Sequence, residues 1–267
     1  MGIAGQIAED WEAALAALAW QLDAGVDETL AGAPVDRYAL PAEAPRAPAV
    51  AAPPLTAPPV VAEAPGETDP VQAARVAAAA AHSLEALREA VTGYDLCDLK
   101  KGARTTVFAD GNPSARVMIV GEAPGREEDL EGLPFVGRAG QLLDRMFAAI
   151  GLDRRSPDAG RALYISNVMV WRPPGNRDPE PAEIAMMKPF LDRHIALADP
   201  QVLVVMGNTP LLALTGTKGI LRARGQWGQV QGRPMLPMTH PAYLLRNPAA
   251  KREAWADLLS LQARLRA

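Results

Sequence analysis

The 267-residue sequence contains one cysteine, few aromatic residues and no long uninterrupted apolar run. A single cysteine, Cys97, excludes a disulfide framework within the chain and any site that needs several thiolates. Glycine, proline or charge interrupts every apolar stretch before about 18 residues, so we expect no membrane-spanning helix and no membrane association. The N-terminus shows no charged leader followed by an apolar core and a cleavage site, which predicts a cytoplasmic protein.

Charge is unevenly distributed along the chain, although the net charge is only −4. Residues 1–85 carry 3 Lys/Arg against 12 Asp/Glu, whereas residues 86–267 carry 24 against 19. An acidic N-terminal segment therefore precedes a basic remainder. That remainder is compatible with a nucleic-acid partner, but its excess of positive charge is too small to establish one.

The amino-acid composition divides the chain into three regions. Residues 1–31 contain an amphipathic helical pattern whose apolar positions recur at spacings of three and four, at Trp11, Leu15, Leu18 and Leu22. Residues 32–70 are rich in alanine and hold ten of the 25 prolines, which predicts a flexible, extended linker. Residues 71–267 are expected to form the folded domain. The N-terminal helix either covers that domain or binds a protein partner.

Short apolar runs alternate with helical patterns in the folded domain. Strands are predicted at 116–120, 163–168, 202–206 and 230–236, and helices at 71–91, 140–150, 182–197 and 251–266. This alternation predicts an α/β fold of three layers, α/β/α, around a central four-stranded parallel sheet. Ligands of such folds bind beyond the carboxyl ends of the strands. That rule brings together the loops after Val120, after Val168 and before His240.

The first of these segments, GEAPGREEDLEGLPFVGRAG, spans residues 121–140. Gly121 allows the backbone close to a ligand, Glu122 lies where a strand ends, and Phe135 is an aromatic residue held between Pro134 and Val136. The segment is neither a P-loop nor a dinucleotide-binding loop, because it lacks the spacing of both. Taken alone, a glycine-rich loop of this kind is more often a solvated turn with an acidic patch and a core phenylalanine than a functional site.

Two further segments carry polar groups at the same predicted edge. In NVMVWRPPGNR, Asn167 ends a strand, where a carboxamide can read the edge of a nucleobase, and Asn176 and Arg177 can reach phosphate. In THPAYLLRNP, His240 precedes a proline that keeps its backbone extended, and Leu244, Leu245 and Arg246 suit a wedge that enters a duplex. Separately, strand-end asparagines are usually turn formers and a single histidine is usually structural.

Together and in this order, GEAPG…EDLEGLPFVGRAGQLLD, NV…RPPGNR and HPAYLLRNP resemble the uracil-DNA glycosylase superfamily, and most closely its family 4. The resemblance runs from about Tyr94 to the C-terminus. It implies a DNA repair enzyme that hydrolyses the N-glycosidic bond of uracil and leaves an abasic site. The substrate is uracil-containing DNA, single-stranded or with the nucleotide flipped out of the duplex. We expect the enzyme to be a monomer.

The resemblance also implies roles for single residues. Phe135 stacks on uracil, Asn167 binds its O4/N3 edge, and His240 donates a hydrogen bond to O2. Glu122 orients the attacking water, with Glu128 and Asp129 as second candidates. Gly121 and Ala123 complete the uracil pocket. The expected DNA contacts are Arg126, Arg138, Asn176, Arg177, Leu244, Leu245 and Arg246.

One feature of the family is missing from this sequence. Family 4 holds a [4Fe–4S] cluster on four cysteines, and the matching positions here are Tyr94, Cys97, Trp171 and Met187. One thiolate cannot hold such a cluster, so we predict that it is absent and that no other metal replaces it. Tyr94, Trp171 and Met187 are expected to fill its volume as core.

Two other functions remain open at the level of sequence. A non-catalytic reader of uracil or abasic DNA would bind the lesion without turnover, but it would not need both Glu122 and His240. A hydrolase of free nucleosides on the same fold would leave the basic surface and the predicted wedge without a role.

Overall fold

The computed structural model describes Leu15 and residues 69–266. The predicted N-terminal helix and linker therefore lie outside the described residues, apart from Leu15, Asp69 and Pro70. No helix in the described part of the chain combines the length and apolar character needed to cross a membrane.

A six-stranded sheet, with strand order β1-β3-β2-β4-β6-β5, forms the centre of the domain. Its strands are β1 (Ala109–Gly111), β2 (Val117–Gly121), β3 (Leu163–Asn167), β4 (Val202–Met206), β5 (Gly228–Val230) and β6 (Arg233–Met238). The four inner strands, β3, β2, β4 and β6, are parallel, as predicted. The antiparallel edge strands β1 and β5 were missed, because three residues are too few to show a periodic pattern.

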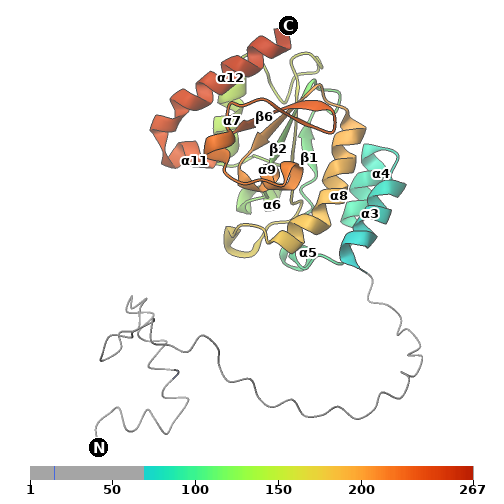
Figure 1. Ribbon diagram of the computed structural model, residues 1–267. Helices are drawn as coiled ribbons and strands as arrows, with labels where there is room; N and C mark the ends of the chain where they lie inside the picture. Colours follow the sequence, from blue (N-terminus) through green and yellow to red (C-terminus); the bar gives the residue numbers. More distant parts are fainter. Residues whose placement is uncertain (1–14, 16–68, 267) are drawn as a thin grey trace, which may run out of the picture. The chain divides into compact units, whose positions relative to one another are not determined.

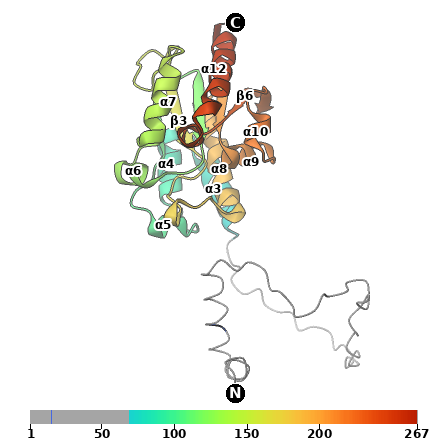
Figure 2. The same ribbon diagram turned by 90° about the vertical axis from the view of Figure 1, so that its left-hand side faces the viewer.

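Helices cover both faces of the sheet and confirm the three-layer architecture. Figure 1 shows α7, α11 and α12 on one side and α3, α4 and α8 on the other, and in Figure 2 α7 and α12 lie towards the viewer. The helices are α3 (Pro70–Ala80), α4 (Leu84–Thr92), α5 (Leu99–Gly102), α6 (Arg126–Glu131), α7 (Arg138–Ala148), α8 (Pro181–Ala198), α9 (Asn208–Thr215), α10 (Ile220–Ala223), α11 (Pro241–Arg246) and α12 (Lys251–Arg266), with 3-10 turns η1 (Pro174–Asn176) and η2 (Pro248–Ala250).

The sheet separates two hydrophobic clusters. Along β2, Val117 and Ile119 pack into the cluster that contains residues of α7 and α12, whereas Met118 and Val120 pack into the cluster that contains residues of α3 and α8. Since neighbouring residues of a strand point to opposite faces, burial of both faces requires an unbroken apolar run. This explains why the inner strands were recognisable in the sequence.

Two predicted elements have different limits in the structure. The alanine-rich helix predicted over 71–91 is two helices, because Ser83 starts a new one by accepting a hydrogen bond from the Ala86 amide at 3.1 Å. The strand predicted over 230–236 crosses a turn. Gln231 and Gly232 both have positive φ there, and β6 begins at Arg233.

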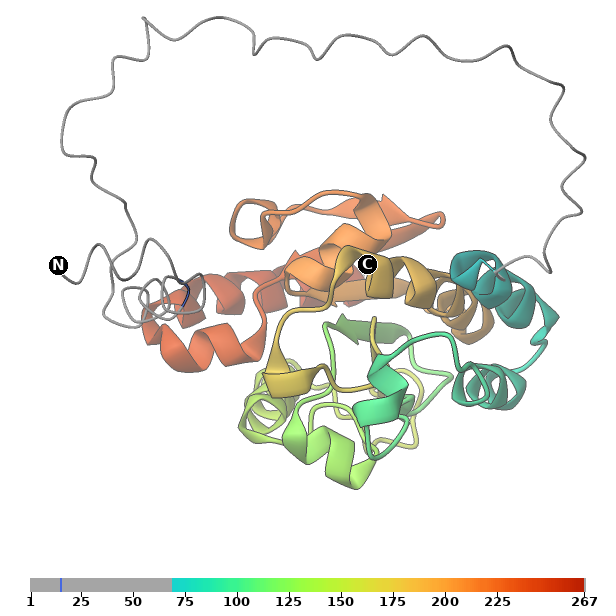
Figure 3. The same ribbon diagram turned by 90° about the horizontal axis from the view of Figure 1, so that it is seen from below.

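The parallel strands place their carboxyl ends at one edge of the sheet. Gly121 at the end of β2 pairs with Asn167 at the end of β3. β4 and β6 end on the same edge, immediately before Gly207 and Thr239. Figure 3 looks onto this edge from below, with α6, η1 and α11 around it.

Candidate active site

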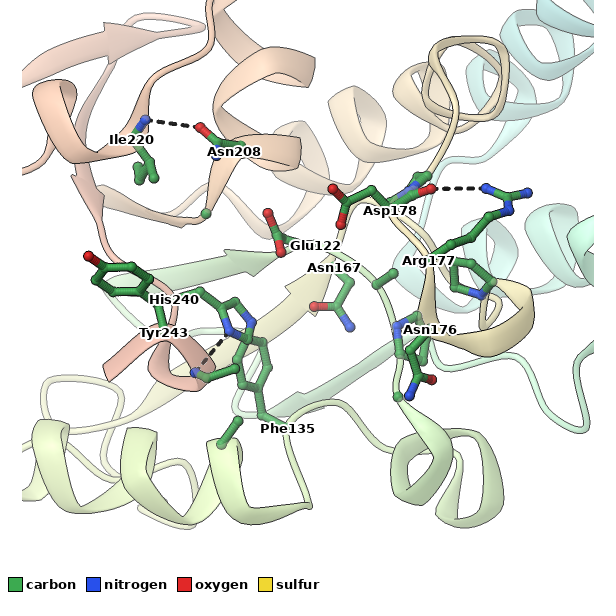
Figure 4. A pocket seen from close by; sticks show the side chains of 18 of the residues that line it. Glu122, Phe135, Asn167, Asn176, Arg177, Asp178, Asn208, Ile220, His240 and Tyr243 are labelled. Atoms are coloured by element: carbon green, nitrogen blue, oxygen red, sulfur yellow. Dashed lines mark hydrogen bonds between the residues drawn. The ribbon is translucent and has the colours of Figure 1, made fainter. Parts of the chain in front are cut away.

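A pocket of about 600 Å³ opens at the carboxyl edge of the sheet. Segments that follow all four parallel strands contribute to its wall. The residues that line it include Glu122, Ala123, Glu128, Phe135, Asn167, Asn176, Arg177, Asp178, Asn208, Ile220, Leu221, Thr239, His240, Tyr243 and Arg246. Figure 4 shows the side chains of Phe135, Asn167 and His240 gathered around one part of this space, with Glu122 beside it.

Gly121 allows the aromatic and carboxamide walls of the pocket to meet. A Cβ at this position would lie 2.3 Å from Asn167 Oδ1 and 2.5 Å from Phe135 Cε2. Both contacts are far shorter than side chains tolerate, so only glycine lets the two groups approach across the end of β2. Gly121 therefore lies behind Asn167 and Phe135 and does not itself line the pocket.

Asn167 has a buried acceptor without a partner. The residue is 4% exposed, and its Oδ1 accepts no hydrogen bond from the described residues. An unpaired buried amide oxygen is costly, typically by about 1–3 kcal/mol. Its presence in the wall of a pocket indicates that a ligand supplies the missing donor.

Phe135 and His240 form the facing aromatic pair of the site. Their ring centroids lie 5.2 Å apart at an interplanar angle of 28°. The Phe135 side chain is buried, yet its backbone has φ of 54°, a left-handed conformation unusual for a bulky residue. Such a conformation persists where the surrounding structure enforces it, and it occurs most often at functional sites.

His240 is held as a neutral imidazole. Its Nδ1 accepts a hydrogen bond from the Ala242 amide at 3.2 Å, at the start of α11. Burial, with a smaller contribution from the positive charge of Arg246, lowers the pKa of His240 to about 4. Because Nδ1 is the acceptor, the proton of the neutral ring is on Nε2, which leaves Nε2–H as the available donor.

Glu122 is half-buried at the N-terminus of α9. One carboxylate oxygen accepts a hydrogen bond from the Thr209 amide at 3.1 Å. Burial raises the pKa of Glu122, and the negative charge of Asp178 adds to this effect, while the amide groups of Thr209 and Asn208 oppose it. The position suits a carboxylate that accepts a hydrogen bond from water on the pocket side.

The two alternative carboxylates have structural roles. Glu128 accepts hydrogen bonds from the amides of Gly125, Val136 and Gly137 at 3.0–3.2 Å. Asp129 is buried and accepts bonds from the amides of Arg104 and Thr105. Their oxygen atoms therefore hold loops in place. This leaves Glu122 as the better candidate for orienting water.

The predicted DNA contacts divide into two groups. Asn176, Arg177 and Arg246 line the pocket, whereas Arg126 and Arg138 are exposed residues outside its wall. The guanidinium of Arg177 forms two hydrogen bonds with the Glu183 carboxylate, at 2.9 and 2.6 Å. Its charge is thereby compensated within the protein, which weakens the case for a phosphate contact.

Leu244, which was predicted to contact DNA, is not accessible to it in the observed packing. Leu244 is fully buried and packs in a small cluster with Leu142 and Ala254. Leu245 is half-buried and packs against the same cluster. α11 places Tyr243 and Arg246 in the pocket wall instead, because a helical turn directs neighbouring residues to different sides.

The segment after β4 contributes to the pocket wall, which was not predicted from the sequence. Asn208, Ile220 and Leu221 line the pocket, and Leu221 is 56% exposed. Asn208 Oδ1 accepts hydrogen bonds from the amides of Gly219 and Ile220, at 3.1 and 3.0 Å, and so fixes this part of the wall. The signal was available, since Gly207 and Asn208 directly follow a predicted inner strand. Asp178 and Tyr243 also line the pocket and were not among the predicted site residues.

The four positions that match cluster ligands lie within one hydrophobic cluster, each at most 6% exposed. The Tyr94 hydroxyl donates to the Pro70 carbonyl at 2.7 Å, and Trp171 Nε1 donates to Thr106 Oγ1 at 3.1 Å. Burial raises the pKa of the Cys97 thiol. A phenol, an indole and a thioether beside one thiol do not fit an iron–sulfur cluster. Within the described residues, no group of three or more His, Cys, Asp or Glu side chains is placed to hold a metal ion.

Comparison with known proteins points to one family. The profile described as "Uracil DNA glycosylase superfamily" matches residues 108–259. The chain is 39% identical over 176 residues to the Type-4 uracil-DNA glycosylase of Sulfurisphaera tokodaii, covering 62% of this chain and 77% of that protein. It is 38% identical to the enzyme of the same name from Thermotoga maritima (61% and 84%) and 35% identical to that of Archaeoglobus fulgidus (66% and 89%).

Proposed function

This chain belongs to the uracil DNA glycosylase superfamily, and we infer from this membership and from the pocket that it is a uracil-DNA glycosylase. It is a hydrolase of base excision repair, which breaks the N-glycosidic bond of uracil in DNA and leaves an abasic site. Its substrate nucleotide leaves the duplex stack or is already single-stranded, because the bond is otherwise out of reach. We propose that it acts as a cytoplasmic monomer.

The main support for this function is the buried Asn167 Oδ1, which accepts no hydrogen bond from the described residues. Uracil offers a donor at N3 and an acceptor at O4, which match the oxygen and the NH₂ group of a carboxamide. Cytosine offers an unprotonated N3 and an amino group instead. It would leave both carboxamide groups of the buried site mismatched, which is how such sites reject an analogue strongly.

Phe135 and His240 complete the recognition and supply the catalytic hydrogen bond. The Phe135 ring provides a face for stacking, beside the carboxamide that reads the base edge. Departure of uracil leaves negative charge on O2, and the Nε2–H of neutral His240 is the donor available to stabilise it. One preorganised donor of this kind typically contributes about 3–4 kcal/mol to the transition state.

Glu122 is the candidate for acting on the attacking water, the second reactant. The Thr209 amide holds one of its oxygen atoms, and the carboxylate lies beside the pocket. We assign it the role of orienting the water that attacks the sugar carbon, and of stabilising the positive charge that develops on the sugar. The helix N-terminus under the carboxylate favours its ionised form, whereas its burial opposes ionisation.

A uracil-release assay tests the assignment. Wild-type protein should release uracil from single- and double-stranded oligonucleotides and should not act on the matched cytosine substrate. Asn167→Ala should slow release by about 100-fold or more, because it removes the base-edge contacts. Asn112→Ala, which changes an asparagine beside β1 that binds the Pro157 carbonyl, is the matched control and should retain the rate.

The two alternative functions predict different results in this assay. Tight binding of uracil DNA without release of the base would identify a reader. Release from deoxyuridine that is as efficient as release from the oligonucleotide would identify a nucleoside hydrolase.

We further propose that the corner around Cys97 holds no iron–sulfur cluster and that the core of Tyr94, Trp171 and Met187 replaces it. Burial raises the pKa of Tyr94 to about 12, which adds to the poor ligand character of this set. Purified protein should show no visible iron–sulfur absorbance and no bound iron, and a chelator should not change its rate. A brown, iron-containing protein would contradict this proposal and leave the glycosylase assignment intact.

A further inference from the structure

The left-handed backbone of Phe135 needs groups that hold it. Its φ of 54° is unfavourable for an aromatic residue, since the Cβ then crowds the neighbouring carbonyl. The residue lies in the turn between α6 and α7, and its side chain forms one wall of the pocket. A small change of this backbone would therefore displace the ring on which uracil stacks.

Arg154 binds the backbone on one side of this turn. Its side chain is 7% exposed. Nη1 donates to the Pro134 carbonyl at 2.9 Å, and Nη2 donates to the Phe135 carbonyl at 3.0 Å. The remaining donors bind carboxylates, with Nε at 2.8 Å from Asp144 on α7 and Nη1 at 3.0 Å from Asp110 on β1. The buried positive charge is thus paired twice while two of its N–H groups hold carbonyls.

Glu128 binds the backbone on the other side. Its Oε1 accepts hydrogen bonds from the amides of Val136 and Gly137, both at 3.2 Å. Two carbonyls and the two following amides are therefore fixed in succession, the carbonyls by a cation and the amides by an anion. Charged groups form the stronger hydrogen bonds of proteins, so this arrangement can maintain an unfavourable φ.

We propose that Arg154 is a positioning residue of the glycosylase reaction, which acts through Phe135 by locking its carbonyl. The proposal rests on the uracil-DNA glycosylase function proposed above. Arg154 does not line the pocket, so it does not touch the substrate. The planar guanidinium is needed because its several donors point in fixed directions, which one ammonium group cannot reproduce.

A double-mutant cycle tests the proposal. The proteins compared are wild type, Arg154→Lys, Phe135→Ala and the double variant, each shown to be folded at the assay temperature. In single-turnover assays, Arg154→Lys should slow uracil release about 10- to 100-fold, as expected for a misplaced reaction partner. In the Phe135→Ala background the same change should slow release by less than about 2-fold, because the ring on which Arg154 acts is absent.

The matched control is Arg116→Lys. Arg116 also donates to a backbone carbonyl, that of Leu265 at 3.0 Å, and to Gln201, but at the opposite end of β2. This variant should keep the wild-type rate. If Arg154→Lys is folded and fully active, or if it slows both backgrounds equally, Arg154 is structural only and the proposal is wrong.

A milder variant covers the case in which Arg154→Lys does not fold. Asp144→Asn weakens the ion pair that orients Nε but leaves both carbonyl contacts available. It should slow release by a smaller factor, about 3- to 10-fold, and again only when Phe135 is present. Equal slowing of Asp144→Asn in both backgrounds would contradict the proposal.

Hydrogen exchange provides a measurement that needs no turnover. The amides of Val136 and Gly137 should exchange faster in Arg154→Lys, or in Asp144→Asn, than in wild type and in Arg116→Lys. Unchanged exchange in this turn would overturn the positioning role. An inactive wild type would instead contradict the proposed function, while the exchange result would still decide whether Arg154 holds the turn.

Discussion

The chemistry of the site depends on how the protonation of single residues is set. The Nδ1 of His240 accepts the Ala242 amide, and burial lowers its pKa to about 4, so the ring is neutral at physiological pH and carries its proton on Nε2. A neutral donor is suited to an oxygen that becomes anionic, because it stabilises the developing charge without requiring that the enzyme be protonated first. Asn167 also presents one defined group to the pocket, because its buried Oδ1 accepts no hydrogen bond from the described residues.

His240→Ala should slow uracil release about 100- to 1,000-fold, because one oxyanion donor is lost. His82→Ala, which changes an exposed histidine between α3 and α4, is the control and should leave the rate unchanged. NMR titration should place the His240 midpoint near 4, so the rate should show no inflection from this residue near pH 6.5. A midpoint near 6.5 would contradict the neutral-donor assignment.

Whole elements bring these residues together. The inner strands β2, β3, β4 and β6 end at one edge. Glu122, Gly207 and Thr239 directly follow β2, β4 and β6, Asn167 is the last residue of β3, and all four line the pocket. α9 begins at that edge. Gly207, with φ of 107°, precedes α9 and leaves the space that the Glu122 carboxylate occupies.

The two glycines that bound α9 allow a matched comparison. At Gly207 an added Cβ would lie 2.5 Å from Glu122 Oε1, whereas at Gly216, with φ of 74°, no heavy atom of the described residues lies within 4 Å of it. Gly207→Ala should therefore displace Glu122 and slow release about 10- to 100-fold. Gly216→Ala should lower the free energy of unfolding by about 1–2 kcal/mol and leave the rate unchanged. Urea unfolding and single-turnover assays measure both; equal rates in the two variants would refute the role given to Gly207.

Two histidines of the folded domain, the buried His194 and the pocket residue His240, have pKa values well below that of a free imidazole. His194 on α8 is 3% exposed, with its Nε2 at 2.8 Å from the Tyr164 hydroxyl and its ring stacked on Phe108. Burial lowers its pKa to about 3. Together with His240, it gives the folded state a lower affinity for protons than the unfolded chain.

This difference predicts acid sensitivity of the fold. Above pH 6.5, the approximate pKa of histidine in the unfolded chain, neither state takes up these protons and the fold keeps its full stability. Stability is lost as the pH falls from there towards the folded-state pKa of each residue, about 4 for His240 and about 3 for His194, because only the unfolded chain takes up the protons. Each histidine should lower the free energy of unfolding by up to about 1.4 kcal/mol per pH unit in this interval. His194→Gln, which can keep a bond to Tyr164, should be less stable at pH 7 but should lose less on acidification. Urea unfolding from pH 7 to pH 4 measures this; equal slopes for the variant and wild type would exclude His194 as a source.

The inner sheet and the segments at its carboxyl edge could be predicted from the amino-acid sequence. Unbroken apolar runs such as 202–206 appear because both faces of these strands are buried, and parallel strands must end at one edge, so Glu122, Asn167 and His240 were expected near one another. These features are local patterns combined with one rule of topology.

The side chains that face the pocket, and the groups that hold them, could not be predicted from the sequence. The burial of Leu244, the ion pair of Arg177 and the hydrogen bonds of Arg154 to a turn about 20 residues earlier depend on contacts between segments that no short pattern relates. The rotation of α11 and the left-handed backbone of Phe135 depend on them as well. A local sequence window specifies the element that forms, whereas packing against distant elements sets the direction of each side chain.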